Sequence, residues 1–481
     1  MHRRRVVGAG LAWSALVALS AAPARAAGPG PDVLVLGAGL AGLQAALHLQ
    51  ASGARVRVLE AAARVGGRVM TLDDLPGRPE TGGTQIGAAY THTLATVARL
   101  GLVLEPNARS PLLDDGRLLL QVQGRRRSLA DWARADDNPL PEAVRALPPD
   151  RALGRLVGSG PLANSQSMSA WRDGSHAALD IPADQALRAR GVSDAALRLL
   201  DISNALGDTL AQTSLLNLHY AQRNVAEIVK VPGAVRNVVG GNQRLPEAMA
   251  RALQGDLLLS QHVVAVDASG SSVTVHCADG SRHTARRVVC TLPLPAMRAV
   301  RFMPALPGPL AEAVQQAAYG RVTQLHLEVL RPFWEADGLA PYLWTDGPLE
   351  RVFAQDRRGS GQAASLTVWV NGAGTAHWDA MDDATAAKQV VEELARVLPA
   401  VQSGAGPAVR LARRVAWHQA PGFGGSWINW APGQITRYAQ VLGLPAGPVH
   451  FAGEHTGTTL RGMEAAMESG LRAAAEVLAL L

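Results

Sequence analysis

The chain has 481 residues, of which 48% are hydrophobic and 18% charged, so it is long enough for two or three domains and too apolar for extensive disorder. Of the 46 basic residues only Lys230 and Lys388 are lysines, and neither lies in a GxxxxGK phosphate loop. Two cysteines, Cys277 and Cys290, are too few for a disulfide scaffold or a Cys-rich metal site, although they could pair with each other.

The first 26 residues resemble an export signal that is removed from the mature protein. Three arginines, at positions 3 to 5, precede a weakly apolar run, and Ala24-Arg25-Ala26 offers a small-x-small cleavage site. The paired arginines are similar to a twin-arginine signal, which predicts export, to the periplasm, of a protein already folded around its cofactor. The four arginines of this segment account for most of the net charge of +6, so nucleic-acid binding is not expected. We also expect no stable membrane span after signal removal.

A dinucleotide-binding unit is predicted directly after the signal. The apolar run 32–36 reads as a buried strand and leads into GAGLAG, residues 37–42, a helix to residue 51 and a second strand ending at Glu60. In such a unit Gly37 allows a tight turn, Gly39 lets the backbone approach a pyrophosphate, and Gly42 lets the helix pack closely on the strand. Pyrophosphate would lie at the helix N-terminus, and Glu60 would bind ribose hydroxyls.

Two further glycine-rich blocks indicate FAD rather than a nicotinamide cofactor. RVGGRV, residues 64–69, and ETGGTQIG, residues 80–87, have no standard use in a nicotinamide dehydrogenase. The glycines again permit close backbone approach, and Arg68 could meet a phosphate or line the flavin.

The rest of the chain predicts alternating strands and helices. We expect strands at 257–266, 272–277, 287–291, 323–330, 350–356 and 364–371, and helices at 194–206, 244–253, 383–398 and 462–480. The Gly/Ser/Ala-rich stretch 154–166 is expected to be a loop.

Taken together, GAGLAG, Glu60, RVGGR and ETGGTQIG resemble the flavin-containing amine oxidases, the group that holds monoamine, polyamine and L-amino-acid oxidases. The resemblance continues through the segment around 239–246, Thr291-Leu292-Pro293, the segment 417–427 and FAGEHT, residues 451–456. It implies an α/β fold in which a Rossmann-like FAD-binding domain (32–104, 233–294 and 410–481) is built from discontinuous segments. An α+β substrate-binding domain would comprise residues 105–232 and 295–409.

The resemblance implies noncovalent FAD, because Ser426 stands where some relatives carry the cysteine that bonds the flavin. Glu454 resembles the acid that binds the ribityl and ribose region, and Val263 the residue whose backbone meets the adenine. The first-turn N–H groups of the last helix, from Met463 onward, would stabilise negative charge on the flavin. The expected cofactor-binding residues are Gly37, Gly39, Ala41, Gly42, Glu60, Gly67, Arg68, Gly83, Thr84, Gln85, Val263, Gly453, Glu454 and Met463.

The same resemblance places the substrate in front of the flavin. Family members usually have two facing aromatic rings there, which together form an aromatic cage around the amine. Trp427 matches one of the two rings. The other position is Gly462, which has no ring, so the cage would be half open. Trp417 is expected to pack on the flavin. Gln324 falls where many members hold a lysine that contacts flavin N5 through water, so it can hold the water but brings no cation. The expected catalytic residues are thus Trp427, Gln324 and Trp417.

The implied function is FAD-dependent oxidation of an amine by hydride transfer from the carbon next to nitrogen to flavin N5, after which water hydrolyses the imine. An L-amino-acid oxidase or dehydrogenase is the main alternative, with Arg461 as candidate partner of the substrate carboxylate, although an ordinary surface role is the favoured interpretation of Arg461. A noncatalytic flavoprotein is a further alternative. The acceptor would be oxygen or a periplasmic electron carrier, and the spacing of the histidines predicts no metal site.

Overall fold

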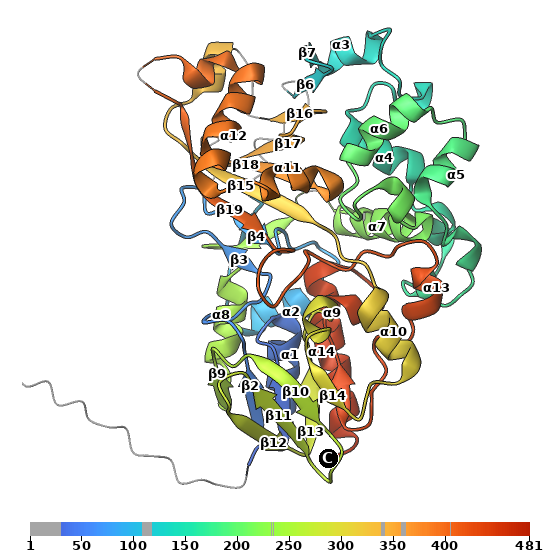
Figure 1. Ribbon diagram of the computed structural model, residues 1–481, viewed down its shortest axis with the longest axis vertical. Helices are drawn as coiled ribbons and strands as arrows, with labels where there is room; N and C mark the ends of the chain where they lie inside the picture. Colours follow the sequence, from blue (N-terminus) through green and yellow to red (C-terminus); the bar gives the residue numbers. More distant parts are fainter. Residues whose placement is uncertain are drawn as a thin grey trace, which may run out of the picture. The chain divides into compact units, whose positions relative to one another are not determined.

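The computed structural model describes residues 30–107, 118–231, 233, 235–337, 342–356, 362–404 and 406–481. The expected signal segment 1–26 lies outside these residues. Residues 31–481 form one compact unit, shown in Figure 1. No helix among the described residues is long and apolar enough to cross a membrane.

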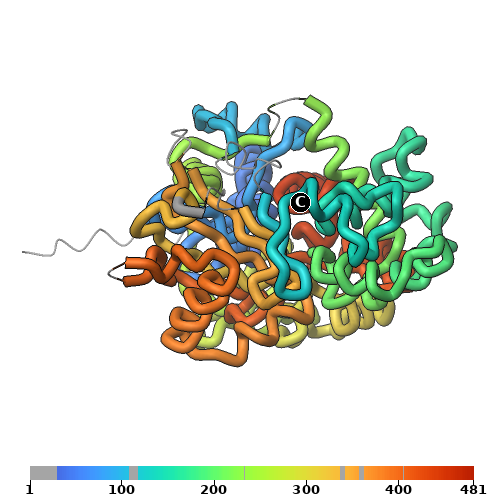
Figure 2. Tube along the Cα trace, turned by 90° about the horizontal axis from the view of Figure 1, so that it is seen from above, coloured from blue at the N-terminus to red at the C-terminus, as the bar shows by residue number. Residues whose placement is uncertain are grey.

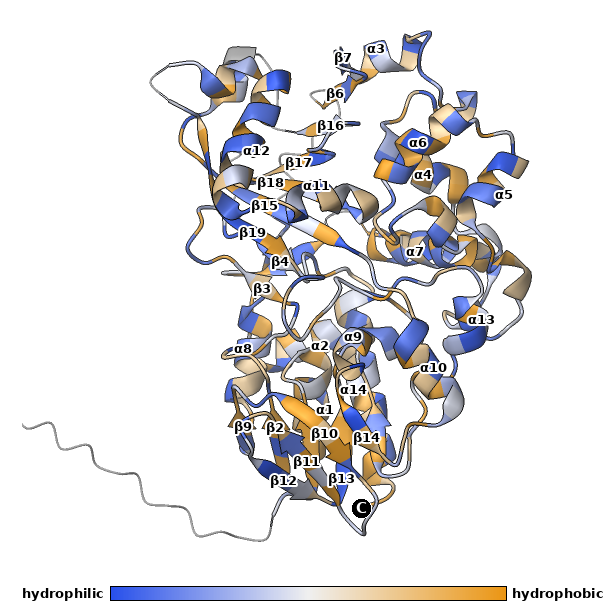
Figure 3. Ribbon diagram, viewed as in Figure 1, coloured by the Kyte–Doolittle hydropathy of each residue, from blue (hydrophilic) through white to orange (hydrophobic). Residues whose placement is uncertain are grey.

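A five-stranded parallel sheet forms the nucleotide-binding layer. Its order is β20 (Val449–Phe451), β13 (Arg287–Cys290), β1 (Val33–Leu36), β2 (Val56–Leu59) and β9 (Asp256–Leu258). β1 is buried along its whole length, as expected for a central parallel strand covered on both faces. Three distant parts of the chain thus meet in one sheet, which lies in the lower part of Figure 3.

Helix α1 (Leu40–Ala51) follows β1 through the GAGLAG turn, and α14 (Gly462–Leu478) packs beside it. Two glycines allow close contacts on either side of α1. A Cβ on Gly42 would collide with the carbonyl oxygen of Gly37 in the preceding turn, and a Cβ on Gly470 of α14 would collide with the carbonyl oxygen of Ala41 in α1. The glycines therefore hold the N-termini of both helices near the carboxyl edge of the sheet.

A four-stranded sheet lies on the nucleotide-binding side in the order β12 (Arg282–Ala285), β11 (Val273–Cys277), β10 (Val263–Asp267) and β14 (Arg301–Met303). The expectation of one strand over 257–266 was wrong, because β9 and β10 belong to different sheets. Ser260, with φ of 58°, turns the chain between them. Cys277 and Cys290 are both buried and free.

A seven-stranded sheet forms the other large layer. Its order is β19 (Val409–Ala416), β15 (Val322–Val329), β18 (Ala363–Asn371), β17 (Arg351–Asp356), β16 (Leu343–Thr345), β6 (Leu119–Val122) and β7 (Arg125–Ser128). Helix α12 (Asp383–Val397) covers one face through a shared apolar core.

A helical segment lies beside the other face of this sheet, as the teal-to-green and orange tubes of Figure 2 show. It includes α4 (Pro149–Val157), α5 (Ala183–Ala189), α6 (Asp194–Ile202) and α7 (Leu215–Ile228). The Nε1 group of Trp344 on β16 donates to Ser203 Oγ at 3.2 Å, which ties the sheet to the end of α6.

Two expectations in this segment need correction. The predicted loop 154–166 begins inside α4, because Pro149 starts a helix whose Ala152, Leu153 and Val157 share a buried face. Helix α6 ends at Ile202 rather than 206, since the Asn204 side chain accepts a hydrogen bond from the N–H of Leu206 and stabilises a turn.

The remaining short strands and helices connect these layers. They are β3 (Met70–Thr71), β4 (Glu80–Gly82), β5 (Leu104–Pro106), β8 (Arg236–Val238), α2 (Thr91–Arg99), α3 (Leu129–Arg134), α8 (Arg244–Arg251), α9 (Leu294–Met297), α10 (Gly308–Gln316), α11 (Thr375–Asp379) and α13 (Gln434–Tyr438). The division into an FAD-binding and a substrate-binding domain stays a prediction. Two strand pairs cross the predicted boundaries between these domains: β14 pairs with β10, and β19 pairs with β15.

Candidate functional site

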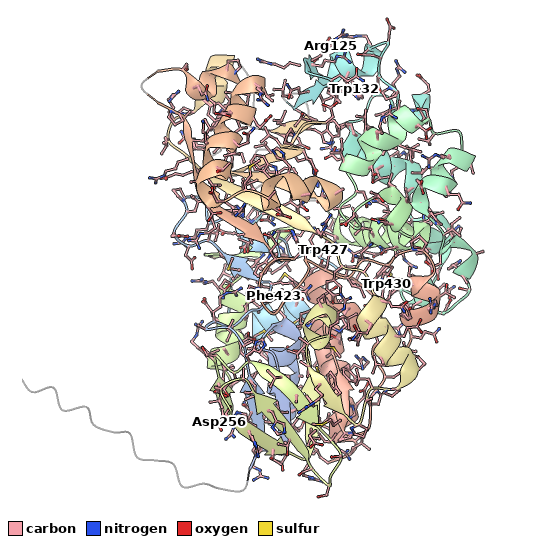
Figure 4. The ribbon with its side chains drawn as sticks, viewed as in Figure 1. Arg125, Trp132, Asp256, Phe423, Trp427 and Trp430 are labelled. Carbon is pink, nitrogen blue, oxygen red and sulfur yellow. The ribbon has the colours of Figure 1, made fainter. Side chains whose placement is uncertain are left out.

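A cavity of about 470 Å³ lies at the carboxyl edge of the five-stranded sheet. Segments that are far apart in sequence line it: both early glycine-rich blocks, the loop after β13, the segment 421–427 and the start of α14. Its lining includes twelve of the expected site residues, namely Gly37, Gly39, Ala41, Glu60, Gly67, Arg68, Gly83, Trp427, Gly453, Glu454, Gly462 and Met463. In Figure 4, Trp427 and Phe423 lie between the two large sheets.

The nucleotide end of the cavity fits a dinucleotide. Gly37 has φ of 103°, which glycine adopts without strain, and a Cβ there would approach Thr291 Oγ1 to 2.6 Å. The carboxylate of Glu60 accepts backbone N–H groups from Ala38 at 2.6 Å and Ala62 at 2.8 Å. These bonds fix the carboxylate in the cavity wall and leave lone pairs for ribose hydroxyls.

A partly buried ionic contact lies in the lining of the cavity. Arg68 Nη1 lies 3.2 Å from Glu454 Oε1 and donates to the carbonyl oxygen of Ser426 at 2.9 Å. Glu454 Oε1 also accepts the N–H of Ile428 at 3.0 Å. Behind Glu454, burial lowers the pKa of His455 to about 3, and the positive charges of Arg68 and Arg472 act in the same direction. The His455 imidazole is therefore neutral at pH 7.

Some expected cofactor residues lie outside the lining of this cavity. Thr84 and Gln85 do not line it: the carbonyl oxygen of Thr84 accepts from Asn107 and Asn237, and Gln85 is exposed on the loop. Val263 lines a neighbouring cavity of about 240 Å³. Gly42 acts through helix packing. The cofactor role of these residues stays a prediction.

Gln324 and Trp417 meet at one main-chain atom rather than in the cavity lining. Gln324 Nε2 and Trp417 Nε1 each donate to the carbonyl oxygen of Thr81 at 2.9 Å. Both side chains are buried, and Gln324 Oε1 has no hydrogen-bond partner among the described residues. The amide of Gln324 thus keeps a free acceptor close to the second glycine-rich block.

Arg461 is neither a free surface residue nor part of the large cavity. Its guanidinium donates to Asn217 Oδ1 at 2.8 Å and to the carbonyl oxygen of Ile428 at 3.2 Å, and it lies 5.3 Å from the ring centroid of Tyr220. This corrects the surface interpretation, because the side chain is held between α7 and the start of α14.

The substrate end combines Trp427 with an aromatic residue that the sequence did not single out. Trp369 on β18 is nearly parallel to Trp427, with an interplanar angle of 20° and ring centroids 6.5 Å apart. Gly462 adopts φ of 65°. If this residue had a Cβ, the one atom within 4 Å of it would be the Tyr90 hydroxyl oxygen, at 3.9 Å, so the space beside Gly462 is open. The second aromatic ring near Trp427 therefore belongs to Trp369 of the seven-stranded sheet. The one sequence signal for this residue was the alternation of side chains between the two faces of a strand.

Glu350, next to this sheet, is a buried acid. Its Oε2 accepts the N–H of Asn371 at 2.8 Å, and its other oxygen lies against Gly374. Burial raises the pKa of Glu350 to about 8, although the nearby Arg351 acts in the opposite direction. The carboxyl group is therefore largely protonated at neutral pH.

Known proteins resemble this chain over nearly its whole length. The family model for flavin-containing amine oxidoreductases matches residues 40–478. An L-amino-acid oxidase of Siganus canaliculatus is 28% identical over 92% of this chain and 85% of its own, and the flavin-containing amine oxidase B of Cavia porcellus is 24% identical over 93% and 86%. The cyclohexylamine oxidase of Brevibacterium oxydans superimposes with a TM-score of 0.75 at 25% identity, covering 94% of this chain and 99% of its own.

The raised pKa of Glu350 predicts a specific pH dependence of stability. A carboxyl group whose pKa rises on folding stabilises the fold below its ordinary value near 4.5, and that contribution is lost as pH rises through about 8. Replacing Glu350 by Gln removes this loss. Between pH 5 and pH 8 the free energy of unfolding of Glu350→Gln should therefore gain about 1–3 kcal/mol relative to wild type, measured by denaturant titration. Glu392→Gln, an exposed control on α12, should follow the wild-type curve, and parallel curves for Glu350→Gln would contradict the prediction.

Proposed function

The chain belongs to the flavin-containing amine oxidoreductases and is an FAD-dependent enzyme that oxidises amines, and we propose which part of its cavity binds the cofactor and which part binds the substrate. The nucleotide half would lie along the α1 N-terminus and Glu60, and the flavin would face Trp427. The observation that carries this arrangement is the single cavity shared by the GAGLAG turn, Glu454, Trp427 and the first turn of α14.

The cavity residues would hold FAD through backbone groups and charge. The N-terminus of α1 would bind the pyrophosphate, and Glu60 the ribose. Arg68 and Glu454 would border the ribityl region, and the N–H groups near Met463 would stabilise negative charge at the flavin ring. Because Ser426 carries no thiol, we propose that FAD is noncovalent and is released when the protein is denatured.

When bound, FAD supplies the acceptor for a hydride equivalent from the carbon next to the amine nitrogen. The protein's part is to orient that carbon and to favour the neutral amine. Trp427 would fix the orientation, while the apolar aromatic surface that it forms with Trp369 excludes water and disfavours an ammonium group. Water then hydrolyses the imine to a carbonyl compound and an amine.

The state of Arg461 supports an amine over an α-amino acid. Recognition of an α-carboxylate needs a guanidinium beside the reacting carbon, and the Arg461 guanidinium is already bonded to Asn217 and Ile428. The L-amino-acid oxidase alternative therefore loses the residue on which it was based.

Anaerobic mixing tests this function. The purified flavoprotein should bleach with amines, and Trp427→Leu should lower the bleaching rate by about 10–100-fold because the amine is no longer oriented, with FAD content retained. The measurement is stopped-flow absorbance of the flavin. Trp378→Phe, a control on α11 at the opposite side of the seven-stranded sheet, should keep the wild-type rate. A protein that binds FAD but bleaches with no amine would contradict the proposal and leave a structural role for FAD.

We propose further that an electron carrier, rather than oxygen, is the physiological acceptor. Reduction of oxygen passes through superoxide, which a nearby cation favours, and position 324 holds a neutral amide.

Introducing the cation should raise the reactivity with oxygen. In Gln324→Lys, the second-order rate constant for reoxidation of the reduced protein by oxygen should rise by about 10-fold or more, since a charge interaction of about 1.4 kcal/mol corresponds to that factor. Gln324→Met is the neutral control. An unchanged rate in a Gln324→Lys variant that retains FAD would argue against the electrostatic role of this position.

We propose that residues 1–26 direct export by the twin-arginine route to the periplasm. Replacing both Arg4 and Arg5 by Lys should move most of the FAD-loaded protein from the periplasmic to the cytoplasmic fraction, measured by flavin content after fractionation. Arg25→Lys, outside the pair, should leave the distribution unchanged. Unaltered export of the double variant would contradict this route.

A further inference from the structure

Segment 420–424, which we call the strap, lies where the large cavity meets its neighbour. Gly422 and Phe423 line both the cavity of about 470 Å³ and the cavity of about 240 Å³. Ala61 and His262, on the nucleotide side, also line both cavities. Because Gly422, Ala61 and His262 are all exposed, the cavities open to solvent between the strap and these two residues.

The chain is anchored on both sides of the strap, whereas the strap itself has few bonds. Before it, the indole of Trp417 donates to the second glycine-rich block, and after it, the N–H of Ser426 donates to a carbonyl oxygen just before β15 at 2.9 Å. The N–H of Phe423 donates locally, to the carbonyl oxygen of Ala420 at 3.1 Å. Among the described residues, no hydrogen bond joins 421–424 to a more distant part of the chain. A segment with so few bonds opens more readily than the layers around it.

Side-chain packing holds the strap in the observed position. The ring of Phe423 meets the ring of Trp417 edge-on, with centroids 4.9 Å apart and an interplanar angle of 69°. Gly422 and Gly424, on either side of Phe423, have φ of 78° and 65°, which glycine adopts without strain. Two glycines that flank one seated ring make a hinged segment with a single aromatic contact to break.

We propose that the strap is the gate through which FAD enters and leaves the cavity, and that the Phe423 ring is its latch. When the ring leaves Trp417, the strap moves away from Ala61 and His262, and the two cavities join into one wider opening. Noncovalent FAD stays bound only while the cavity is closed around it, so this latch sets the rate at which the cofactor exchanges. The inference goes beyond the amine chemistry and rests on the proposed placement of FAD in the large cavity.

The exchange rate of FAD tests the latch. The FAD-loaded protein is mixed with excess isotopically labelled FAD, and mass spectrometry of the bound cofactor follows the exchange. In Phe423→Ala the exchange rate should rise about 10-fold, because loss of an edge-on aromatic contact corresponds to about that factor, and Phe423→Leu should fall between. The control Phe302→Ala removes a partly buried ring that contacts Phe451 instead, so its exchange rate should stay within about 3-fold of wild type. An unchanged rate in Phe423→Ala would overturn the proposal.

The equilibrium Kd separates a gate from a simple contact with FAD. A latch between two protein side chains slows entry and exit alike, so Phe423→Ala should keep the Kd for FAD within about 3-fold of wild type. The Kd is measured from the fluorescence of free FAD in serially diluted protein. A Kd that rises by the same factor as the exchange rate would show that Phe423 acts through contact with FAD, and the gate would be refuted.

A second variant tests the hinge and keeps the Phe423 ring. At Gly422 an added Cβ meets no atom within 4 Å apart from its chain neighbours, so Gly422→Ala introduces no clash and disfavours only the observed backbone conformation. Exchange of FAD should become about 5-fold faster. Gly280→Ala is the matched control, because Gly280 is exposed in the turn between β11 and β12, with φ of 85° and an equally open Cβ position. Equal exchange rates in the two variants would contradict the hinge.

The outcomes distinguish this inference from the proposed function. A protein that exchanges FAD as expected but bleaches with no amine would refute the proposed function and leave the gate in place. Bleaching by amines, together with an FAD exchange rate that neither Phe423→Ala nor Gly422→Ala changes, would refute the gate alone.

Discussion

The close approach of glycine backbones at the carboxyl edge of the five-stranded sheet is the constraint on which the site depends. The Gly37 turn packs against Thr291, α1 packs on that turn through Gly42, and α14 packs on α1 through Gly470. Any Cβ at these points would separate two helix N-termini from the strand edge. The positive ends of both helices therefore face one cavity, where a pyrophosphate and a reduced flavin each carry negative charge.

This constraint explains why the nucleotide half could be predicted from the sequence. The GAGLAG turn, Glu60 and the last helix are local signals, since glycine spacing and apolar runs determine strand, turn and helix within a few residues. The prediction was wrong where an apolar run concealed a change of sheet, at Ser260, and where Pro149 started a helix ahead of a glycine-rich stretch.

The substrate half was less predictable for a different reason. The relation of Trp369 to Trp427 depends on cross-strand register and on the packing of two layers. Neither is encoded within a short window of sequence. Arg461 directly precedes α14, yet one of its hydrogen-bond partners, Asn217, lies on α7, more than two hundred residues away in the chain.

Thr81 connects the two halves through its main chain. Its carbonyl oxygen accepts hydrogen bonds from Gln324 and from Trp417, so one peptide group of the second glycine-rich block is attached to β15 and to the segment after β19. Because the shared acceptor belongs to the backbone, neither hydrogen bond uses the side chain of residue 81. The residues of β17 and β18 take no part in these two bonds, so their side chains can differ without removing this connection between the layers.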